Sequence, residues 1–177
     1  DELVRLRGYQ FLSLKPVVVV ANVAEDRAGA DPDPSLAAAC ERAGHALCAL
    51  SAPIEAEIAG LDDAERREFM ADLGIDTPAV DRFLRAAYAG LGLISFLTAG
   101  PDECRAWSVR DGATAPEAAG RIHTDLQRGF IRAEVVAFEN LREHGDEKAA
   151  KAAGVYRLEG KEYVVRDGDV IEVRFSV

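Results

Sequence analysis

Two polar side chains, Asn22 and Glu25, directly follow an apolar run that contains four valines, residues 17–20. Such a run predicts a strand buried on both faces inside a parallel sheet. In open α/β sheets, ligands bind outside the carboxyl ends of the strands, which is where Asn22 and Glu25 are expected. An Asn amide both donates and accepts hydrogen bonds, and a carboxylate accepts them. This pair is therefore suited to reading the edge of a polar ligand.

A second apolar run at residues 46–50 ends in Ser51 and Ala52. Between the two runs, the pattern predicts a helix of about ten residues that begins after Asp33 and ends at Gly44. Strand, helix and strand form a βαβ unit with parallel strands. Ser51 and Ala52 are therefore expected beside Asn22, at the same edge of the sheet.

The spacing Asn-x-x-Glu after an apolar strand resembles the base-recognition motif of P-loop nucleotidases, which is usually Asn-Lys-x-Asp. Val23 replaces the Lys and Glu25 replaces the Asp, and this pair of changes is similar to the YchF (Obg-like) ATPases, whose pockets favour adenine over guanine. In P-loop nucleotidases, a Ser-Ala dipeptide after the last strand backs the base with main-chain groups. The resemblance implies a nucleotide-base site made of Asn22, Val23, Glu25, Ser51 and Ala52.

The chemistry of the bases agrees with a preference for adenine. In GTPases an Asp carboxylate accepts hydrogen bonds from the N1–H and the exocyclic amine of guanine, and adenine has neither donor at those places. The side chain of Glu25 is one methylene longer, so its carboxylate cannot take the same position without a backbone shift. The Asn22 amide suits the N6/N7 edge of adenine, and Val23 offers an apolar face.

Composition excludes several classes of protein. The 177 residues are 49% hydrophobic and 29% charged, as in ordinary globular domains, and they suffice for one domain or two small ones. No apolar run approaches the roughly 20 residues of a membrane span. Three scattered cysteines favour neither a disulfide framework nor a zinc site, so we expect a cytoplasmic protein. The net charge of −10, concentrated in residues 1–92, argues against broad electrostatic binding to nucleic acid.

The chain divides into three segments. Residues 1–16 carry a broken helical stripe that stops before Pro16, and they fit either the tail of a helical insertion or a short amphipathic helix. Residues 17–92 continue past the second strand with three helices. The last of these has an apolar face at helical spacing. That face comprises Val80, Phe83, Leu84, Ala87, Tyr88 and Leu91.

From residue 93 to residue 177 the pattern changes to short strands and turns, and we place the domain boundary at Gly92. Thr114 and Glu117 predict the start of a helix that reaches Leu126. Two strands, one helix and further strands favour a β-grasp, ubiquitin-like domain. The expected strands are residues 93–98 and 105–109, paired as a hairpin, then 130–138, 156–158, 162–165 and 170–175.

This second half carries a more specific resemblance. GATAPEAAGRIHTDLQRGFIRAEVVAF and the terminal DGDVIEVRF resemble the TGS domain at the end of YchF proteins, and the run HTDLQRGFIRAEV distinguishes this family from other TGS proteins. The two resemblances imply an α/β fragment of a P-loop nucleotidase domain with parallel strands and helices. An α+β β-grasp (ubiquitin-like) TGS domain is expected to follow it.

The phosphate-binding motif G-x-x-x-x-G-K-[ST] does not occur in the sequence. The YchF family keeps its P-loop and switch loops upstream of a helical insertion. We therefore expect the C-terminal part of a YchF-like protein that, when intact, binds and hydrolyses ATP, and GTP less well. The resemblance also implies magnesium with ligands outside this chain, association with ribosomes, and a monomer. These residues alone are not expected to hydrolyse nucleotides. The alternative is a non-enzymatic TGS-type adaptor that binds RNA or protein.

Partner binding in the second half is assigned to Arg121, Arg128 and Arg132, around the end of the predicted helix. Two of these arginines could instead pair with Asp125 and Glu134 and only support the fold. Other candidates are weaker: helix-end or partner-binding His123, loop residue His144, and the sheet residues Trp107 and Tyr163, which could also stack on RNA.

Overall fold

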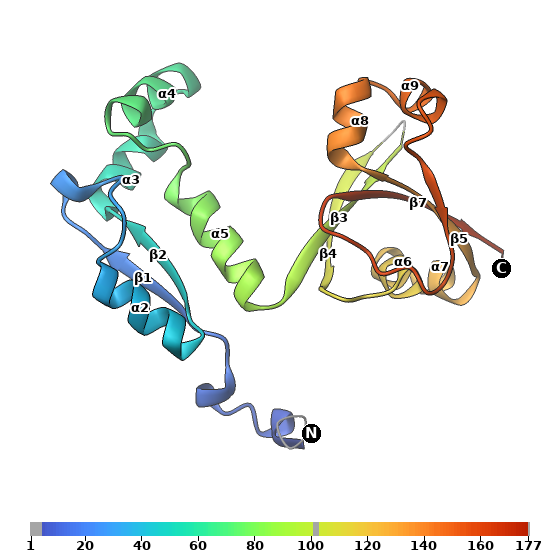
Figure 1. The fold of residues 1–177 in the computed structure, drawn as a ribbon, viewed down its shortest axis with the longest axis horizontal. Helices are drawn as coiled ribbons and strands as arrows, with labels where there is room; N and C mark the ends of the chain where they lie inside the picture. Colours follow the sequence, from blue (N-terminus) through green and yellow to red (C-terminus); the bar gives the residue numbers. More distant parts are fainter. Residues whose placement is uncertain (1–4, 101–102, 177) are drawn as a thin grey trace. The chain divides into compact units, whose positions relative to one another are not determined.

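The structure, a computed structural model, describes residues 5–100 and 103–176. The chain divides into two compact units, and the division falls between Leu91 and Gly92. Figure 1 traces the order of the elements along the chain. Among the described residues, no helix is long and apolar enough to span a membrane.

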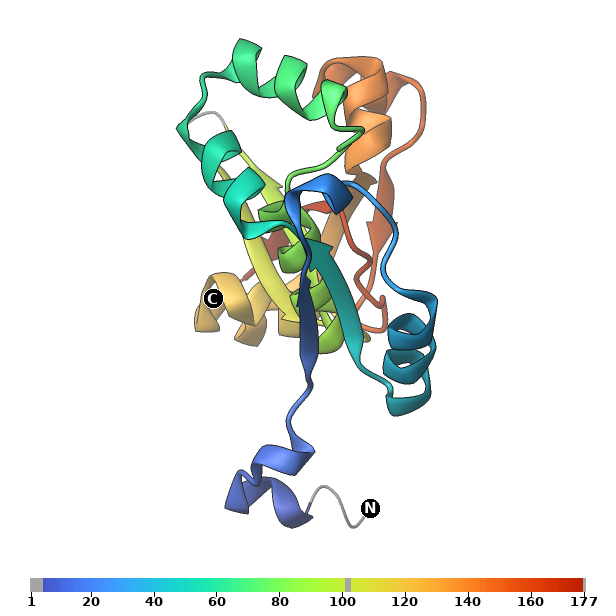
Figure 2. The same ribbon diagram turned by 90° about the vertical axis from the view of Figure 1, so that its left-hand side faces the viewer.

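The first unit is built around two parallel strands, β1 (Val18–Asn22) and β2 (Ala46–Leu50), which run side by side in Figure 2. Their register pairs Val18 with Ala46 and Asn22 with Leu50. Helix α2 (Pro34–Ala43) connects them, as the apolar pattern predicts. The two strands therefore end at the same level, and the polar residues after each end come together.

The predicted ends of α2 are confirmed. The Asp33 carboxylate accepts hydrogen bonds from the backbone N–H groups of Ser35 and Leu36, which otherwise lack partners in the first turn. The hydrogen bond from the Ser35 hydroxyl, followed by those from the two backbone donors, lowers the pKa of Asp33. Gly44 ends the helix in the left-handed conformation, at φ 67°. Cys40 is buried, as expected of a core residue.

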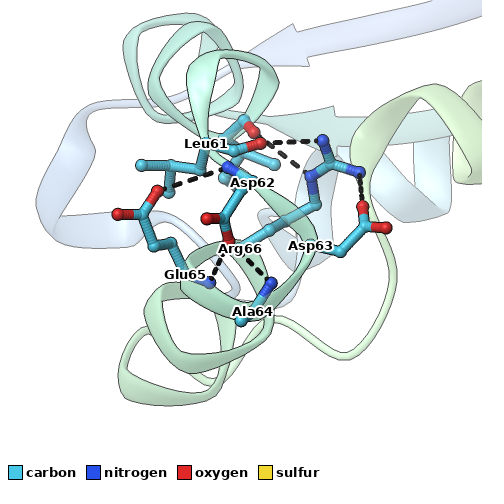
Figure 3. Close-up of polar contacts among 7 residues, drawn as sticks. Leu61, Asp62, Asp63, Ala64, Glu65 and Arg66 are labelled. Carbon is cyan, nitrogen blue, oxygen red and sulfur yellow. Dashed lines mark hydrogen bonds and ion pairs between the residues drawn. The ribbon is translucent and has the colours of Figure 1, made fainter.

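Helices α3 (Ala52–Gly60) and α4 (Asp63–Asp72) follow β2. Figure 3 shows the capping box of α4: Asp62 accepts from the backbone of Glu65 at 3.0 Å, and Glu65 accepts from the backbone of Asp62 at 3.3 Å. The Arg66 guanidinium donates to the carbonyl of Leu61, which joins the end of α3 to the start of α4. The apolar sides of the two helices, with Ile75 from the segment after α4, form a small cluster of Ile54, Ile58, Met70 and Ile75.

Helix α5 (Ala79–Gly90) exposes the larger residues of its apolar stripe. Val80 is 63%, Leu84 47% and Leu91 51% exposed, whereas Ala79 is buried and Ala87 half-buried. Helix α5 lies against β2 and β1 within this unit. Ala79 and Ala87 are thus at least partly covered, and the large apolar side chains of α5 remain at the surface of the unit.

One expectation for the first unit is wrong. Strand β1 is not buried on both faces, because Val17 and Val20 are exposed: the described unit places only β2 beside it. The broken helical stripe before Pro16 does not form one continuous helix. Residues Arg7–Tyr9 and Leu12–Leu14 form two short 3-10 turns (η1 and η2), separated at Gln10, whose positive φ of 52° interrupts the helical path. The part of the predicted helix on residues 1–4 lies outside the described residues.

The second unit contains a mixed five-stranded sheet in the order β4-β3-β7-β5-β6. Strands β3 and β7 are parallel, and the other neighbouring pairs are antiparallel. The predicted hairpin is formed by β3 and β4, with Phe96 opposite Trp107. The strands are β3 (Leu93–Ala99), β4 (Cys104–Arg110), β5 (Phe130–Ala137), β6 (Arg157–Glu159) and β7 (Asp169–Phe175).

Helix α6 (Ala115–Ile122) packs its alanines against this sheet. Its predicted start is confirmed, since Glu117 accepts hydrogen bonds from both the backbone N–H and the hydroxyl of Thr114. Those bonds lower the pKa of Glu117. Trp107, on β4, and Tyr163, which lies outside the strands, are both partly buried against the same core. The fully buried core includes Phe96, Ala118, Ala133, Val135 and Val165.

The continuous helix expected to reach Leu126 is instead two helices, α6 and α7 (Thr124–Arg128). His123 separates them in an extended conformation. Its Nδ1 accepts from the backbone N–H of Asp125 and so caps α7, which confirms a helix-end role. The pattern favours one helix because Leu126 continues the apolar spacing. The spacing does not reveal that His123 satisfies the new helix start.

Three further details of the second unit differ from the prediction. Residues 162–165 form no strand, only an isolated bridge between Thr114 and Val164. Two helices, α8 (Phe138–His144) and α9 (Glu147–Ala152), form in a segment for which the sequence pattern predicts neither helix. His144 is the last residue of α8 and not a loop residue, and its Nδ1 lies 2.8 Å from the carbonyl oxygen of Asn140.

A buried polar network links the start of β7 to the segment before it. Asp169 is 2% exposed, and its carboxylate accepts from the Tyr163 hydroxyl at 2.7 Å and from the Arg166 backbone at 2.9 Å. Arg157 lies 3.4 Å from the same carboxylate. Burial, followed by the hydrogen bond to Asp169, raises the pKa of Tyr163 to about 12. The network keeps the Tyr163 phenol protonated and satisfies a buried charge.

Candidate functional site

The amide of Asn22 lies at the carboxyl end of β1, where its Oδ1 accepts a hydrogen bond of 3.0 Å from the backbone N–H of Ala52. The atom facing Ala52 must be the oxygen, because the N–H of Ala52 is a donor. The strand register brings these groups together although 30 positions separate them in sequence. One end of the Asn22 amide is thereby used within the protein, and its Nδ2 remains the donor on an exposed side chain.

Ser51 lies between the end of β2 and the start of α3 and is 2% exposed. Within residues 5–100 and 103–176, its Oγ has no hydrogen-bond partner. A buried hydroxyl without a partner costs about 1–3 kcal/mol. This unsatisfied group adjoins Ala52, the residue that Asn22 holds, so the sheet edge has unused polar capacity beside its exposed amide.

Val23 and Glu25 are positioned differently from each other. The backbone N–H of Val23 donates to the carbonyl of Leu50 at 2.8 Å, so Val23 still follows the sheet. Glu25 begins the short 3-10 turn η3 (Glu25–Arg27), and its side chain is exposed. In the part of the chain that the structure describes, the Glu25 carboxylate has no hydrogen bond or ion pair. Asn22, Val23, Ser51 and Ala52 are thus brought together, and Glu25 stands free at the following turn.

The three candidate partner-binding arginines come from different elements. Arg121, near the end of α6, donates from Nε to the carbonyl of Ser108, and Arg128, in α7, pairs with Asp125 at 3.1 Å. Arg132, on β5, has no ion pair with Glu134. Instead Arg174 donates to Glu134 at 2.6 Å and 2.9 Å.

These hydrogen bonds from Arg174 lower the pKa of the Glu134 carboxyl. All three candidate arginines are exposed. Arg132 also lines a shallow hollow on the sheet, next to Ile131 and Phe175. Of the two pairings that would leave the arginines purely structural, the one with Asp125 exists and the one with Glu134 does not.

Comparison with known proteins decides the family. The family model YchF-GTPase_C, described as "Protein of unknown function (DUF933)", matches residues 93–176. The chain is 50% identical to the "Ribosome-binding ATPase YchF" of Haemophilus influenzae over 180 residues, which cover 100% of this chain and 49% of that protein. It is also 48% identical to the protein of the same name from Bacillus subtilis, and that match covers 97% of this chain and 48% of the relative. The chain belongs to the YchF family.

A solved structure agrees with this assignment. The YchF GTPase of Schizosaccharomyces pombe superposes with a TM-score of 0.77 at 30% sequence identity, covering 91% of this chain and 44% of that one. The chain spans about half the length of the curated YchF relatives that it matches. The resemblance stated from NVAE and from HTDLQRGFIRAEV is therefore confirmed at the level of the YchF family.

The magnesium implied by the YchF family has no evident ligands among the described residues. Within residues 5–100 and 103–176, no group of three or more His, Cys, Asp or Glu side chains could hold a metal ion.

One residue near the site is not singled out by the sequence pattern. Gly29 follows η3 and has a positive φ of 79°. The short polar loop DRAGAD contains it without any motif that marks a special role. The only indication in the sequence is the glycine itself, because glycine is typical of positions with a positive φ or a close approach of the backbone.

Proposed function

We propose that the chain is the C-terminal part of a YchF nucleotidase, and that its first unit supplies the edge that binds the nucleotide base, with a preference for ATP. The observation that carries this proposal is the hydrogen bond from the Ala52 N–H to Asn22 Oδ1. It fixes the amide at the carboxyl ends of two parallel strands, where α/β folds bind ligands. The names of the relatives from H. influenzae and B. subtilis, ribosome-binding ATPases, support the same activity for the intact protein.

In this proposal, Asn22 binds the purine and other residues distinguish adenine from guanine. Oδ1 already accepts a hydrogen bond from Ala52, and we assign the Nδ2 donor of the amide to the N7 acceptor that adenine and guanine share. Asn22 therefore binds purines without distinguishing them. Discrimination falls to Val23 and Glu25, since they replace the residues that recognise guanine in related nucleotidases. The Ser51 hydroxyl and the N-terminal end of α3 back the base.

The exposed apolar residues of the first unit are consistent with a surface that another part of the protein covers. Large apolar groups at the surface of a unit mark an interface. We propose that the rest of the nucleotidase domain, with the phosphate-binding loop and the magnesium ligands, covers α5 and the exposed valines of β1. Residues 1–16 are then the tail of a helical insertion, and residues 17–92 complete the nucleotidase domain. The intact protein is expected to be cytoplasmic and monomeric.

Exchanging the two unusual residues is expected to shift base preference towards guanine. In the full-length protein that contains this chain, Val23→Lys combined with Glu25→Asp should shift the relative binding free energies of ATP and GTP towards GTP by about 1–3 kcal/mol. This is the usual cost of leaving buried polar groups unpaired. Dissociation constants for both nucleotides measure the shift. Asp26→Glu, in the same exposed turn, is the matched control and should leave the ratio unchanged. An unaltered ratio in the double variant would refute the base-site assignment.

A second role is proposed for residues 93–177: a β-grasp TGS domain that docks the protein to the ribosome or another RNA-containing partner. The exposed arginines Arg121, Arg128 and Arg132 support it, since Arg132 is not used to hold Glu134. The alternative, a TGS-type adaptor without nucleotide chemistry, shares this docking role. It differs in predicting no effect of the base-site exchange.

Replacing Arg121, Arg128 and Arg132 together by Ala should weaken association of the 177-residue chain with ribosomes and reduce its salt dependence. Each lost phosphate contact lowers the log–log slope by about 0.7–0.9. Co-sedimentation with ribosomes at two salt concentrations measures both effects, and a cooperative melt checks the fold. A triple Ala variant of the exposed Arg105, Arg110 and Arg142 removes the same charge and is the control. Equal losses in both variants would argue for a non-specific charge effect.

A further inference from the structure

The turn that begins with Glu25 ends in a close approach to helix α4. A Cβ atom at Gly29 would lie 2.7 Å from the carbonyl oxygen of Leu73, 3.3 Å from that of Gly74 and 3.3 Å from Cγ1 of Ile75. The first of these distances is shorter than real Cβ contacts allow, and the atom it meets belongs to the backbone. No side-chain rotation could relieve it. Gly29 also has φ +79°, so glycine is required there for two independent reasons.

The same turn is continuous with the candidate base site. The N–H of Ala28 donates to the carbonyl of Glu25 at 3.0 Å, and the N–H of Ala30 donates to the carbonyl of Arg27 at 3.1 Å. Ala28 packs against the apolar cluster of α3 and α4. Because these hydrogen bonds connect the backbone of the turn, a displacement at Gly29 also moves the backbone of Glu25.

The backbone at Glu25 is fixed by contacts on both sides of the turn. The described residues make no hydrogen bond or ion pair with its side chain. On one side, Val23 is bonded to the end of β2. On the other, Gly29 lies against the end of α4. The position of the Glu25 backbone thus depends on two anchors, the sheet and the α4 end.

We propose that Gly29 is a positioning residue that sets where the Glu25 carboxylate stands relative to the Asn22 amide, and thereby sets the purine preference. The proposal rests on the base-site function proposed above. Hydrogen bonds to a base weaken steeply with misplacement and misalignment, so a backbone shift of a fraction of an ångström is enough to matter. Gly29 itself offers no side chain to a ligand and acts only through the path of the backbone.

Gly29→Ala in the full-length protein is expected to reduce the ATP-over-GTP affinity ratio by about tenfold, with Asn22 and Ser51 unchanged. The matched control is Gly44→Ala, because Gly44 has a similar φ of +67° but nothing within 4 Å of an added Cβ. Gly44→Ala therefore imposes the conformational strain without the clash. It should lower stability and leave the affinity ratio as it is.

A second measurement follows the turn without any nucleotide. In the 177-residue chain, hydrogen exchange of the Ala28 and Ala30 amides should become about tenfold faster in Gly29→Ala and should not change in Gly44→Ala. Ala28→Gly removes the packing of the same anchor without introducing a clash. It should shift exchange and the affinity ratio in the same direction to a smaller extent, and it serves if Gly29→Ala does not fold.

The outcomes separate the two proposals. Faster exchange with an unchanged affinity ratio would overturn the positioning role of Gly29, and the base site would stand if the Val23 and Glu25 exchange still alters the ratio. An equal effect of Gly44→Ala on the ratio would also overturn it. If the Val23 and Glu25 exchange has no effect, the base site itself fails, whatever Gly29→Ala does.

Discussion

Asp169→Ala is expected to lower the free energy of unfolding of the second unit by about 1–3 kcal/mol, the cost of leaving partly buried hydrogen-bond donors without their acceptor. The Asp169 carboxylate is the shared acceptor for the Tyr163 hydroxyl and the Arg166 backbone, and it is the ion-pair partner of Arg157. Asp169 is 2% exposed, whereas Tyr163 and Arg157 are half-buried, so removing the carboxylate leaves these donors without their acceptor at a site that water reaches only in part. The loss should appear as an earlier urea midpoint with an unchanged slope.

Two companion variants make the Asp169 result specific. Tyr163→Phe removes one donor and leaves the carboxylate bonded to the Arg166 backbone, so it should cost only about 1 kcal/mol. Asp111→Ala, at an exposed turn, removes the same charge without removing a buried acceptor and should have little effect. If Asp169→Ala is as mild as Asp111→Ala, the network does not stabilise the second unit.

Gly129→Ala is the second change with a large expected effect on stability, up to about 3 kcal/mol, the upper part of the range for overpacking. An added Cβ would lie 2.9 Å from the carbonyl carbon of Ser176 and closer still to its oxygen. Ser176 also donates to the Gly129 carbonyl at 2.9 Å, so the backbone after β7 cannot move away without losing that bond. The φ of −87° at Gly129 is ordinary, and the cost is therefore steric alone.

The control for Gly129 is Gly160→Ala, where an added Cβ meets nothing within 4 Å. Thermal and urea unfolding of the 177-residue chain should separate the two variants clearly. Comparable stability of both would mean that the end of β7 adapts at no cost. In that case the glycine within RGFIRAEV would need another explanation.

The candidate site shows how far local patterns reach. Four valines followed by Asn22, and an apolar pentapeptide followed by Ser51, place two strand ends, and the helix between them makes the strands parallel. Because parallel strands in register end at one level, the meeting of Asn22 with Ala52 follows from the sequence. Which atom of Asn22 is used does not follow from it. The neighbouring N–H of Ala52 decides that, and it changes the part that Asn22 can play in reading a base.

Burial was harder to predict than secondary structure. Apolar runs mark β1 and α5 correctly, but a run of valines does not say what lies on each face of the strand. In the first unit Val20 and Leu84 remain exposed, because burial depends on which other elements are present. The break between α6 and α7 was also missed. The apolar spacing predicts one helix there, whereas the His123 side chain caps a new helix start.

The amino-acid sequence by itself determined the family, the ends of β1, α2 and β2, and the capped start of α6. Each of these depends on residues within a few positions of one another, where caps and apolar spacing act. Only the tertiary structure decided the approach of Gly29 to Leu73, the burial of Asp169 against Tyr163, and the closeness of Gly129 to Ser176. These contacts form only when the chain folds. Local sequence patterns therefore do not predict their distances or their packing.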